Sequence, residues 1–197
     1  MLRGDLYLAD DPMLIEERAR AQRLLEQINA TGIDLLTTRH ALLAELLGSF
    51  GEGAEILPPL RCDYGSTTSV GARTFINYGA VILDPGYVRI GADVQIGPNA
   101  QLLTATHPVD AATRRARWES AQPITIEDGA WLGGGVIVCP GVTIGSDAVI
   151  GAGSVVTRNI PAGVVAVGNP CRVIRDARSS VSGADRWIGW LGRRRFT

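Results

Sequence analysis

The chain contains no lysine: its 19 basic residues are all arginine and are balanced by 20 acidic residues, for a formal net charge of −1. A protein that binds nucleic acid as its main partner is expected to carry a marked basic excess. The near-neutral net charge therefore argues against nucleic acid as the main binding partner. Hydrophobic residues make up 46% and charged residues 20% of the 197 residues, a composition typical of a folded chain with a buried core.

Metal-binding and disulfide-forming residues are also scarce. The chain has two histidines, His40 and His107, and three widely spaced cysteines, Cys62, Cys139 and Cys171. The odd cysteine count and the absence of a CxxC motif argue against a disulfide framework and a zinc site, so no metal is predicted. No apolar run approaches the roughly 20 residues of a membrane helix, and the N-terminus does not resemble a signal peptide. We expect a cytoplasmic protein without membrane insertion.

A six-residue repeat dominates the chain. Residues 126–163 read "IEDGAW LGGGVI VCPGVT IGSDAV IGAGSV VTRNIP AG", with a branched aliphatic residue in every sixth position: Ile126, Leu132, Val138, Ile144, Ile150 and Val156. An upstream set comprises Val70, Ile76, Ile82 and Val88, and after "DPGY" the phase shifts by two and resumes at Ile90, Ile96 and Leu102. A period of six fits neither an α-helix nor a heptad, but it fits short strands separated by tight turns.

Each position of the repeat has an expected structural role. The aliphatic residue points inward. The residue after it is usually glycine, which we attribute to a turn whose backbone conformation side chains resist. The fifth position often holds a small residue, as at Ala100, Ala130, Ala148 and Ser154, where a packed interior leaves little room. Stacked coils of this kind form a parallel β-helix with one continuous core, so the fold class is mainly β.

The two ends of the chain depart from the repeat. Residues 10–29 predict a helix that Asp10 or Asp11 caps and in which Pro12 suits the first turn. A second helix is predicted from Thr38 to about Leu47, and both helices would cover the open end of the solenoid. We divide the chain into an N-terminal helical segment (1–55), a β-helix (56–176) with a loop at 104–123, and a C-terminal extension (177–197). The aromatic and basic residues of the extension could bind a membrane surface or a partner. One short cluster of this kind is a weak signal, so we favour a tail that packs on the solenoid or frays.

The stretch "LTATHPVDAATRRARWESAQP" interrupts the repeat after Leu102. It is too polar and irregular for a coil, so we predict a protruding loop. Long loops on rigid scaffolds are disproportionately functional. His107 stands at the root of this loop, where a solenoid would hold it firmly. Histidine changes its charge near neutral pH, which makes His107 a candidate acid or base. The arginines at 114, 115 and 117 are either solvated or in contact with a neighbouring subunit.

Several motifs, in order along residues 1–176, resemble those of the maltose and galactoside O-acetyltransferases and the related nodulation acetyltransferases. They are "GDLYLADDP", "RCDYGSTTSVG", "INYGAVILD", "TATHPVDAATR" and the run from "PITIEDGAW" to "NPCRVIR". The resemblance implies that the β-helix is left-handed. It also implies a homotrimer with active sites between neighbouring β-helices, which moves acetyl from acetyl-CoA to a sugar hydroxyl.

The resemblance assigns catalytic roles to three positions. His107 matches the family's general base, which takes the proton of the acceptor hydroxyl as that oxygen attacks the thioester. Direct transfer in a ternary complex needs no covalent acyl-enzyme. The backbone N–H of Gly134 in "LGGG" is the candidate donor to the oxyanion. Asn77 in "INY" matches a catalytic and acceptor-site asparagine; its structural alternative is a turn position that asparagine tolerates.

Acidic residues on the acceptor side are carried over in the same way. The N-terminal motif places Asp10 or Asp11 near the acceptor, and we select Asp11. Asp63 in "RCDYG" faces the acceptor by family position. Asp84 in "ILDPG" is a candidate acceptor of a sugar hydroxyl bond, or else a turn carboxylate. The family often has another residue or a second acid where Pro85 stands, which weakens the match there.

The positions implied for acetyl-CoA lie later in the chain. The resemblance places them along the pantetheine channel and the nucleotide site: Trp131, Gly134, Ala152, Thr157, Arg158, Arg172 and Arg175. Trp131 is otherwise a wall residue of the solenoid. The two last arginines, otherwise a solvated edge, suit the phosphates of CoA because guanidinium pairs with phosphate through two hydrogen bonds.

Three other functions are alternatives to sugar acetylation. A γ-type carbonic anhydrase shares the β-helix but needs three histidines on zinc, which two histidines do not supply. A related acyltransferase acting on serine, an antibiotic or a nucleotide sugar stays an alternative, because acceptors vary widely. A non-enzymatic scaffold is the third, since a repeat fold by itself does not give a function.

Overall fold

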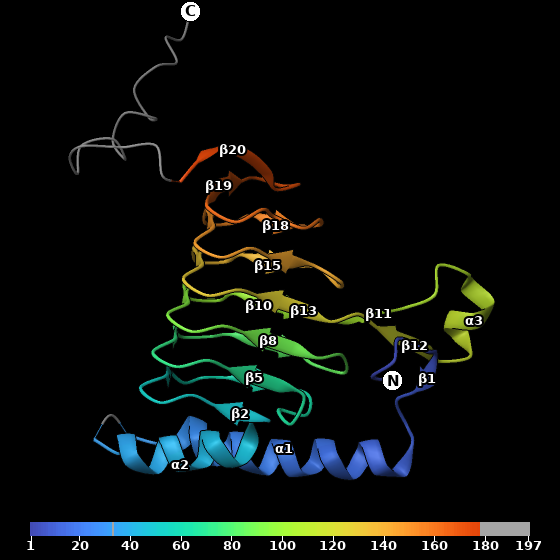
Figure 1. The fold of residues 1–197 in the computed structure, drawn as a ribbon. Coiled ribbons are helices and arrows are strands. Elements are labelled where there is room, and N and C mark those ends of the chain that lie inside the picture. The colour runs from blue at the N-terminus through green and yellow to red at the C-terminus, as the bar shows by residue number, and fades with distance from the viewer. Residues whose placement is uncertain (33, 178–197) are drawn as a thin grey trace, which may run out of the picture.

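The computed structural model describes residues 1–32 and 34–177, so all but the first residue of the C-terminal extension lies outside the described residues. These residues form a triangular column of stacked coils with two helices under its N-terminal end (Figure 1). The helices are α1 (Pro12–Ala30), α2 (Leu36–Leu46) and the short α3 (Ala111–Arg115).

The column has three faces, named here in the order in which the chain visits them. The first face contains β2 (Ser49–Phe50), β5 (Thr68–Val70), β8 (Val88–Ile90), β13 (Ile124–Ile126) and β16 (Thr143–Ile144). The second contains β3 (Glu55–Ile56), β6 (Phe75–Ile76), β9 (Gln95–Ile96), β14 (Trp131–Leu132), β17 (Val149–Ile150), β19 (Val164–Val167) and β20 (Arg172–Asp176). The third contains β4 (Arg61–Cys62), β7 (Val81–Leu83), β10 (Gln101–Leu103), β15 (Ile137–Val138) and β18 (Val155–Val156).

Pairing between successive coils is parallel and keeps the six-residue register. Leu102 of β10, for example, aligns with Ile82 of the coil below and Val138 of the coil above. Among the strands of the three faces that the structure describes, only β20 runs antiparallel to its neighbour, folding back on β19 at the C-terminal end. The predicted fold class is confirmed: the repeat indicated a parallel β-helix, and the family resemblance implied its left hand, the helical N-terminal cap being expected from the first helices and the protruding loop from the break in the repeat.

The core of the column follows the repeat. Every aliphatic residue assigned to the inward position is buried, as Leu132 and Ile144 illustrate with 0% exposure each. The small residues of the fifth position are buried as well, including Ala148 and Ser154. Both predictions are confirmed, because inward side chains from three faces meet along one axis and leave space only for small groups at the corners.

The reason given for the repeat glycines is wrong. Gly97 and Gly133 do not have positive φ; the left-handed positions come two residues later, for example at Asn99 and Gly135. A Cβ on Gly133 would instead lie 2.6 Å from the backbone nitrogen of Ala152 in the next coil. Close stacking of coils, rather than backbone conformation, therefore excludes side chains at this position.

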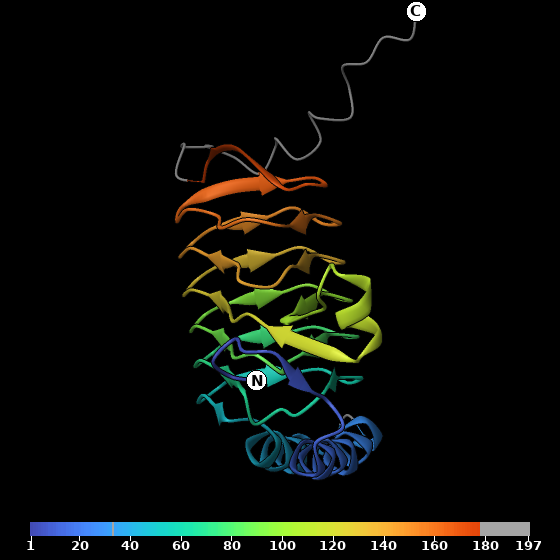
Figure 2. The same cartoon turned by 90° about the vertical axis from the view of Figure 1, so that its right-hand side faces the viewer.

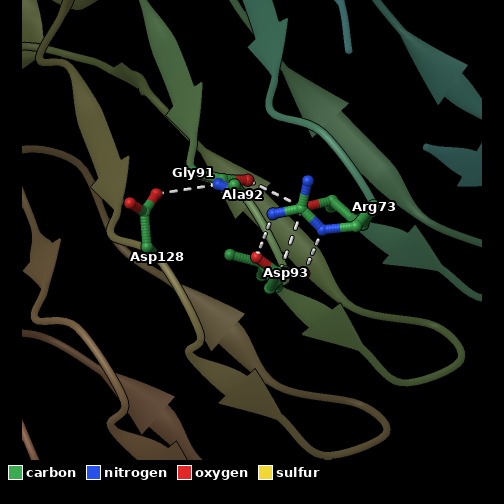
Figure 3. Close-up of polar contacts among 7 residues, drawn as sticks. Arg73, Gly91, Ala92, Asp93 and Asp128 are labelled. Carbon is green, nitrogen blue, oxygen red and sulfur yellow. Dashed lines mark hydrogen bonds and ion pairs between the residues drawn. The ribbon is translucent and has the colours of Figure 1, made fainter. Parts of the chain in front are cut away.

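The corner between the first and second faces shows how neighbouring coils are joined (Figure 3). Arg73 donates to both carboxylate oxygens of Asp93 one coil above, at 2.7 and 2.5 Å. Asp128, on the next coil, accepts from the backbone nitrogen of Ala92 at 2.8 Å. These side chains are exposed, and such contacts align the coils more than they stabilise them.

The N-terminal helices close the lower end of the column. Asp11 is the N-cap of α1, with its carboxylate accepting from the backbone nitrogen of Met13 at 2.9 Å. Asn29 of α1 docks on the first coil, since its amide accepts from the nitrogen of Leu60 at 2.8 Å and donates to its oxygen at 2.9 Å. Both predicted helices form, with bounds that differ from expectation by two residues or fewer. Among the described residues, no helix is long and apolar enough to cross a membrane.

The interruption of the repeat protrudes from the column as predicted (Figures 1 and 2). It is more ordered than an irregular loop, because β11 (Ala105–Thr106) and β12 (Trp118–Ala121) form an antiparallel pair around α3. The N-terminal strand β1 (Tyr7–Leu8) joins the other edge of β12. This three-stranded sheet, which the sequence did not reveal, brings the start of the chain beside the loop.

Candidate active site

An open cleft of about 450 Å³ lies between the N-terminal segment, α1 and the protruding loop. Its lining residues are Ala9, Asp10, Ile15, Arg18, His107, Arg114, Arg117 and Glu119. His107 follows β11 directly and is exposed, so its imidazole is open to the cleft. The structure thus places the histidine at the root of the loop, at the edge of a polar hollow.

The charged groups around the cleft are partly paired with one another. Asp10 forms an ion pair with Arg117 at 2.9 Å. Arg114 donates to the backbone oxygens of Pro108 and Val109, at 2.9 Å each. Arg114 and Arg117 therefore line the cleft and bond to groups of the same chain. The contact of the loop arginines with a neighbouring subunit stays a prediction. The described residues contain no group of three or more His, Cys, Asp or Glu side chains suited to hold a metal ion.

The acceptor-side prediction for the N-terminal segment needs a correction by one residue. Asp11, the residue selected, caps α1, and its carboxylate is directed at the helix backbone. Asp10, the alternative, lines the cleft. The shift arises because a helix cap turns its side chain toward the first-turn N–H groups and away from neighbouring surfaces.

Asp84 also has a different place from the one predicted. Its side chain is 0% exposed. One carboxylate oxygen accepts from the backbone nitrogens of Asp63 at 3.1 Å and Tyr64 at 2.9 Å, and the other accepts from the nitrogen of Gly65 and the hydroxyl of Thr68, each at 2.8 Å. With four donors in place, no oxygen remains for direct contact with an acceptor. Asp84 instead holds the turn at residues 63–65.

Asp63 lies on that turn and is close enough to Arg18 and Glu119, two residues of the cleft lining, for their charges to affect it. Burial raises the pKa of its carboxyl, the neighbouring charge of Asp84 raises the pKa further, and Arg18 opposes both effects. Arg18 donates to the hydroxyl of Tyr64 at 3.0 Å, with its guanidinium carbon 5.5 Å from the ring centroid. The assignment of Asp63 to the acceptor side stays a prediction.

A second group of predicted residues lies at the corner between the second and third faces. Asn77 is half-buried there, and its side-chain oxygen accepts from the backbone nitrogen of Tyr78 at 2.7 Å. Asn77 does not have positive φ, which excludes the alternative that asparagine stands here because it tolerates a left-handed turn conformation. Trp131, at the end of the second face, is 43% exposed. Ala152, exposed, stacks over the Gly133 turn one coil below.

Gly134 has an unusual backbone environment at the same corner. The backbone nitrogens on either side of it donate hydrogen bonds to adjacent coils: that of Gly133 to the oxygen of Ile150, and that of Gly135 to the oxygen of Pro98, at 2.8 Å each. The N–H of Gly134 donates no hydrogen bond within the part of the chain that the structure describes. A backbone donor without an internal partner is free to serve a ligand.

The remaining predicted CoA residues are exposed on the upper coils. Thr157 and Arg158 follow β18 on the third face. Arg172 and Arg175 lie on β20, opposite Val167 and Val165 of β19. Each guanidinium group donates to one backbone oxygen: Arg172 to that of Cys171 at 2.8 Å, and Arg175 to that of Asp176 at 3.1 Å. Most of their donor groups are therefore available to a phosphate.

One chain does not bring all of these residues together. His107 departs from the corner where the third face ends, whereas Asn77 and Gly134 lie where the third face begins. The strands of the third face separate the two groups. A single site containing both would need the His107 corner of one chain and the Gly134 corner of another.

Three residues around the cleft were missed from the sequence: Tyr7, Arg18 and Glu119. Tyr7 and Glu119 are joined by a hydrogen bond of 3.0 Å between the phenol and the carboxylate. Arg18 lies on the cleft side of α1, where helical periodicity marks it only as polar. The missing signal is the pairing of β1 with β12, since these strands are more than a hundred residues apart.

Two family models match this chain, one at its N-terminal cap and one in the β-helix. Residues 1–51 match the maltose acetyltransferase hexapeptide capping motif, and residues 123–158 match the bacterial transferase hexapeptide with six repeats. The chain is 49% identical over 173 residues to nodulation protein L of Rhizobium leguminosarum bv. viciae, covering 88% of this chain and 91% of the relative. It is 40% identical over 173 residues to the galactoside O-acetyltransferase of Escherichia coli K12, covering 88% and 85%.

Solved structures give the same likeness in three dimensions. A maltose O-acetyltransferase from Clostridium difficile 630 superposes with a TM-score of 0.88 at 45% identity, covering 89% of this chain and 94% of that one. A hexapeptide-repeat acetyltransferase from Vibrio cholerae in complex with acetyl coenzyme A superposes with a TM-score of 0.85 at 37% identity, covering 90% and 96%.

Proposed function

The chain belongs to the maltose and galactoside O-acetyltransferase family of hexapeptide-repeat enzymes, and from this premise we propose that it acetylates a hydroxyl of a sugar or related small acceptor. As a member of this family it is an acetyl-CoA-dependent acetyltransferase. That assignment removes the non-enzymatic scaffold from the alternatives. A donor of this kind is an intracellular metabolite, which supports action in the cytoplasm.

The observation that carries the proposal is the place of His107 in a polar cleft. Its imidazole forms no hydrogen bond or ion pair within the described chain, so it is available to a bound hydroxyl. The acceptor oxygen attacks the thioester carbonyl carbon while its proton passes to the imidazole. The C–S bond then breaks, and the departing CoA sulfur takes that proton to leave as the thiol. A base in this role contributes about 10²–10⁴-fold to the rate.

The oxyanion that develops on the carbonyl requires a hydrogen-bond donor. The N–H of Gly134, which has no partner within the described chain, supports this role. Asn77 lies at the same corner two coils below, and we propose that its side chain binds the acceptor, as the resemblance implies. A backbone donor of this type needs no reorganisation when charge develops, which is the basis of its effect on the rate.

Acetyl-CoA is proposed to lie along the column above this corner. Trp131 and Ala152 would line the pantetheine, with Thr157 and Arg158 beyond them on the neighbouring corner. Arg172 and Arg175 would bind phosphates at the C-terminal end. Their exposure and their unsatisfied donors support this path.

A homotrimer is proposed because the site is divided between two corners of one chain. The outward side chains of the third face, which lies between those corners, are mostly apolar and only partly buried: Val81, Leu83, Leu103, Ile137 and Val155. The first face carries polar outward residues in the same positions, including Ser69 and Thr125. The second face is mixed, with Phe75, Trp131 and Val149 in its outward positions beside Glu55 and Gln95. The largely apolar third face, which lies between the two halves of the site, supports contact with another copy.

The test of the proposed base is the variant His107→Ala. We expect acetyl transfer, followed as thiol release from acetyl-CoA against a panel of sugars and small alcohols, to fall by at least about a hundredfold. His40→Ala is the matched control, since His40 contacts Phe50 edge-on in the N-terminal cap, away from the cleft. Circular dichroism and sedimentation would verify that both variants keep the fold and assembly. Transfer retained by His107→Ala would exclude this residue as the base.

A further inference from the structure

The sheet formed by β11, β12 and β1 sets three functional groups in one row. The register pairs Tyr7 with Glu119 on one side of β12, and Thr106 with Ser120 on the other. Continued by one residue, the antiparallel register of β11 and β12 sets His107 opposite Glu119. Residues directly opposite in such a pair share a face, with Cβ atoms about 4.5–5.5 Å apart. Glu119 is therefore the carboxylate that the loop itself places beside the proposed base.

Glu119 has one oxygen engaged and one open. The Tyr7 phenol, 8% exposed, donates to Oε2 at 3.0 Å. Burial raises the pKa of the Tyr7 phenol, and the hydrogen bond to Glu119 and the charge of that carboxylate raise it further, so the phenol keeps its proton and stays a donor. Within the described residues Oε1 has no hydrogen-bond partner, and Glu119 lines the cleft. Asp10, the other carboxylate in the lining, is already paired with Arg117.

Glu119 and His107 both line the cleft, and no ion pair links them among the described residues. A base and a carboxylate acceptor that face one cleft without bonding to each other match two adjacent hydroxyl groups better than one. The first hydroxyl would give its proton to the imidazole, and the second would donate a hydrogen bond to the carboxylate.

We propose that Glu119 determines acceptor specificity by binding a second hydroxyl next to the one that is acetylated, so that the acceptors are 1,2- or 1,3-diols such as sugars and polyols. Tyr7 is the positioning residue that fixes the carboxylate. This inference rests on the proposed function, because it assumes that His107 takes the proton of the first hydroxyl. A charge-assisted hydrogen bond of this kind accounts for about tenfold or more in acceptor binding.

The test compares matched acceptors in matched variants. A sugar glycoside or diol is paired with its deoxy analogue, which lacks the hydroxyl next to the acetylated one, and kcat/KM is measured at saturating acetyl-CoA. Glu119→Gln is expected to lower kcat/KM for the diol about tenfold or more, and to change that of the deoxy analogue less than about threefold. Tyr7→Phe shifts the same ratio in the same direction by less. Glu26→Gln, an exposed carboxylate on α1, leaves both acceptors unchanged.

Two results would overturn the inference: an unchanged ratio in Glu119→Gln, or an equal loss for both acceptors. Binding measured by calorimetry separates this failure from failure of the proposed function. On the His107→Ala background, with CoA present, diol affinity should exceed that of the deoxy analogue, and adding Glu119→Gln should remove the difference. A difference that persists refutes the role of Glu119 whatever the role of His107. Full turnover by His107→Ala refutes the base while the binding comparison still stands.

Discussion

The buried carboxylate of Asp84 offers a sharp test of how the acceptor side is built. It accepts four hydrogen bonds, three from the backbone turn at residues 63–65 and one from Thr68, at 2.8–3.1 Å. All four partners donate, which suits a group that only accepts. Asp84→Asn keeps the shape of the side chain and replaces one oxygen with an NH₂ group. The variant therefore changes hydrogen bonding and charge without opening a cavity.

The expected loss follows from these contacts. The amide oxygen of asparagine can still accept hydrogen bonds from the backbone nitrogens of Asp63 and Tyr64, although the acceptor is then neutral. The Thr68 hydroxyl can rotate so that it accepts from the new NH₂ group. The N–H of Gly65 then faces a donor and stays unsatisfied, which costs about 1–3 kcal/mol. Weaker bonds add to this loss, and relief from burying a charge offsets part of it. We expect about 2–4 kcal/mol less free energy of unfolding.

Urea unfolding followed by circular dichroism, at one fixed protein concentration, measures this difference. Asp128→Asn is the matched control, because that exposed carboxylate accepts one backbone bond, from Ala92, and asparagine retains the acceptor oxygen. It should change stability by less than about 0.5 kcal/mol. If Asp84→Asn also lies within about 0.5 kcal/mol of the original chain, the hydrogen-bond reasoning for Asp84 is refuted.

Two further expectations concern acetyl-CoA and assembly. Arg172→Ala together with Arg175→Ala should weaken CoA binding by about tenfold or more by calorimetry, while Arg89→Ala, an exposed arginine on the first face, should not; equal affinities would exclude the phosphate role. Sedimentation velocity should give the mass of a trimer, because the His107 and Gly134 corners of one chain are separated by the third face; a single monomeric species would contradict a site shared between chains.

Much of the column was predictable because its information is local. The inward aliphatic residues repeat every six positions, and each needs only its own coil to be recognised. The small residues at Ala148 and Ser154 follow from the same count. The glycine positions were also predicted, but for the wrong reason. Their side-chain exclusion comes from the coil above, as at Gly133 against Ala152, and contact between coils is not visible within one repeat.

In the candidate site, too, local features were predictable from the sequence and contacts between distant residues were not. The sequence alone determined that the chain is a hexapeptide β-helix with His107 at the root of a long loop, since periodicity and its interruption are properties of neighbouring residues. Only the tertiary structure decided that Asp10 rather than Asp11 meets the cleft, that Asp84 is buried against the turn at residues 63–65, and that Glu119 lines the same cleft as His107. These facts depend on a helix cap, a buried turn and the pairing of β1 with β12. Register between strands so distant in sequence is set by packing in three dimensions, for which no local pattern exists.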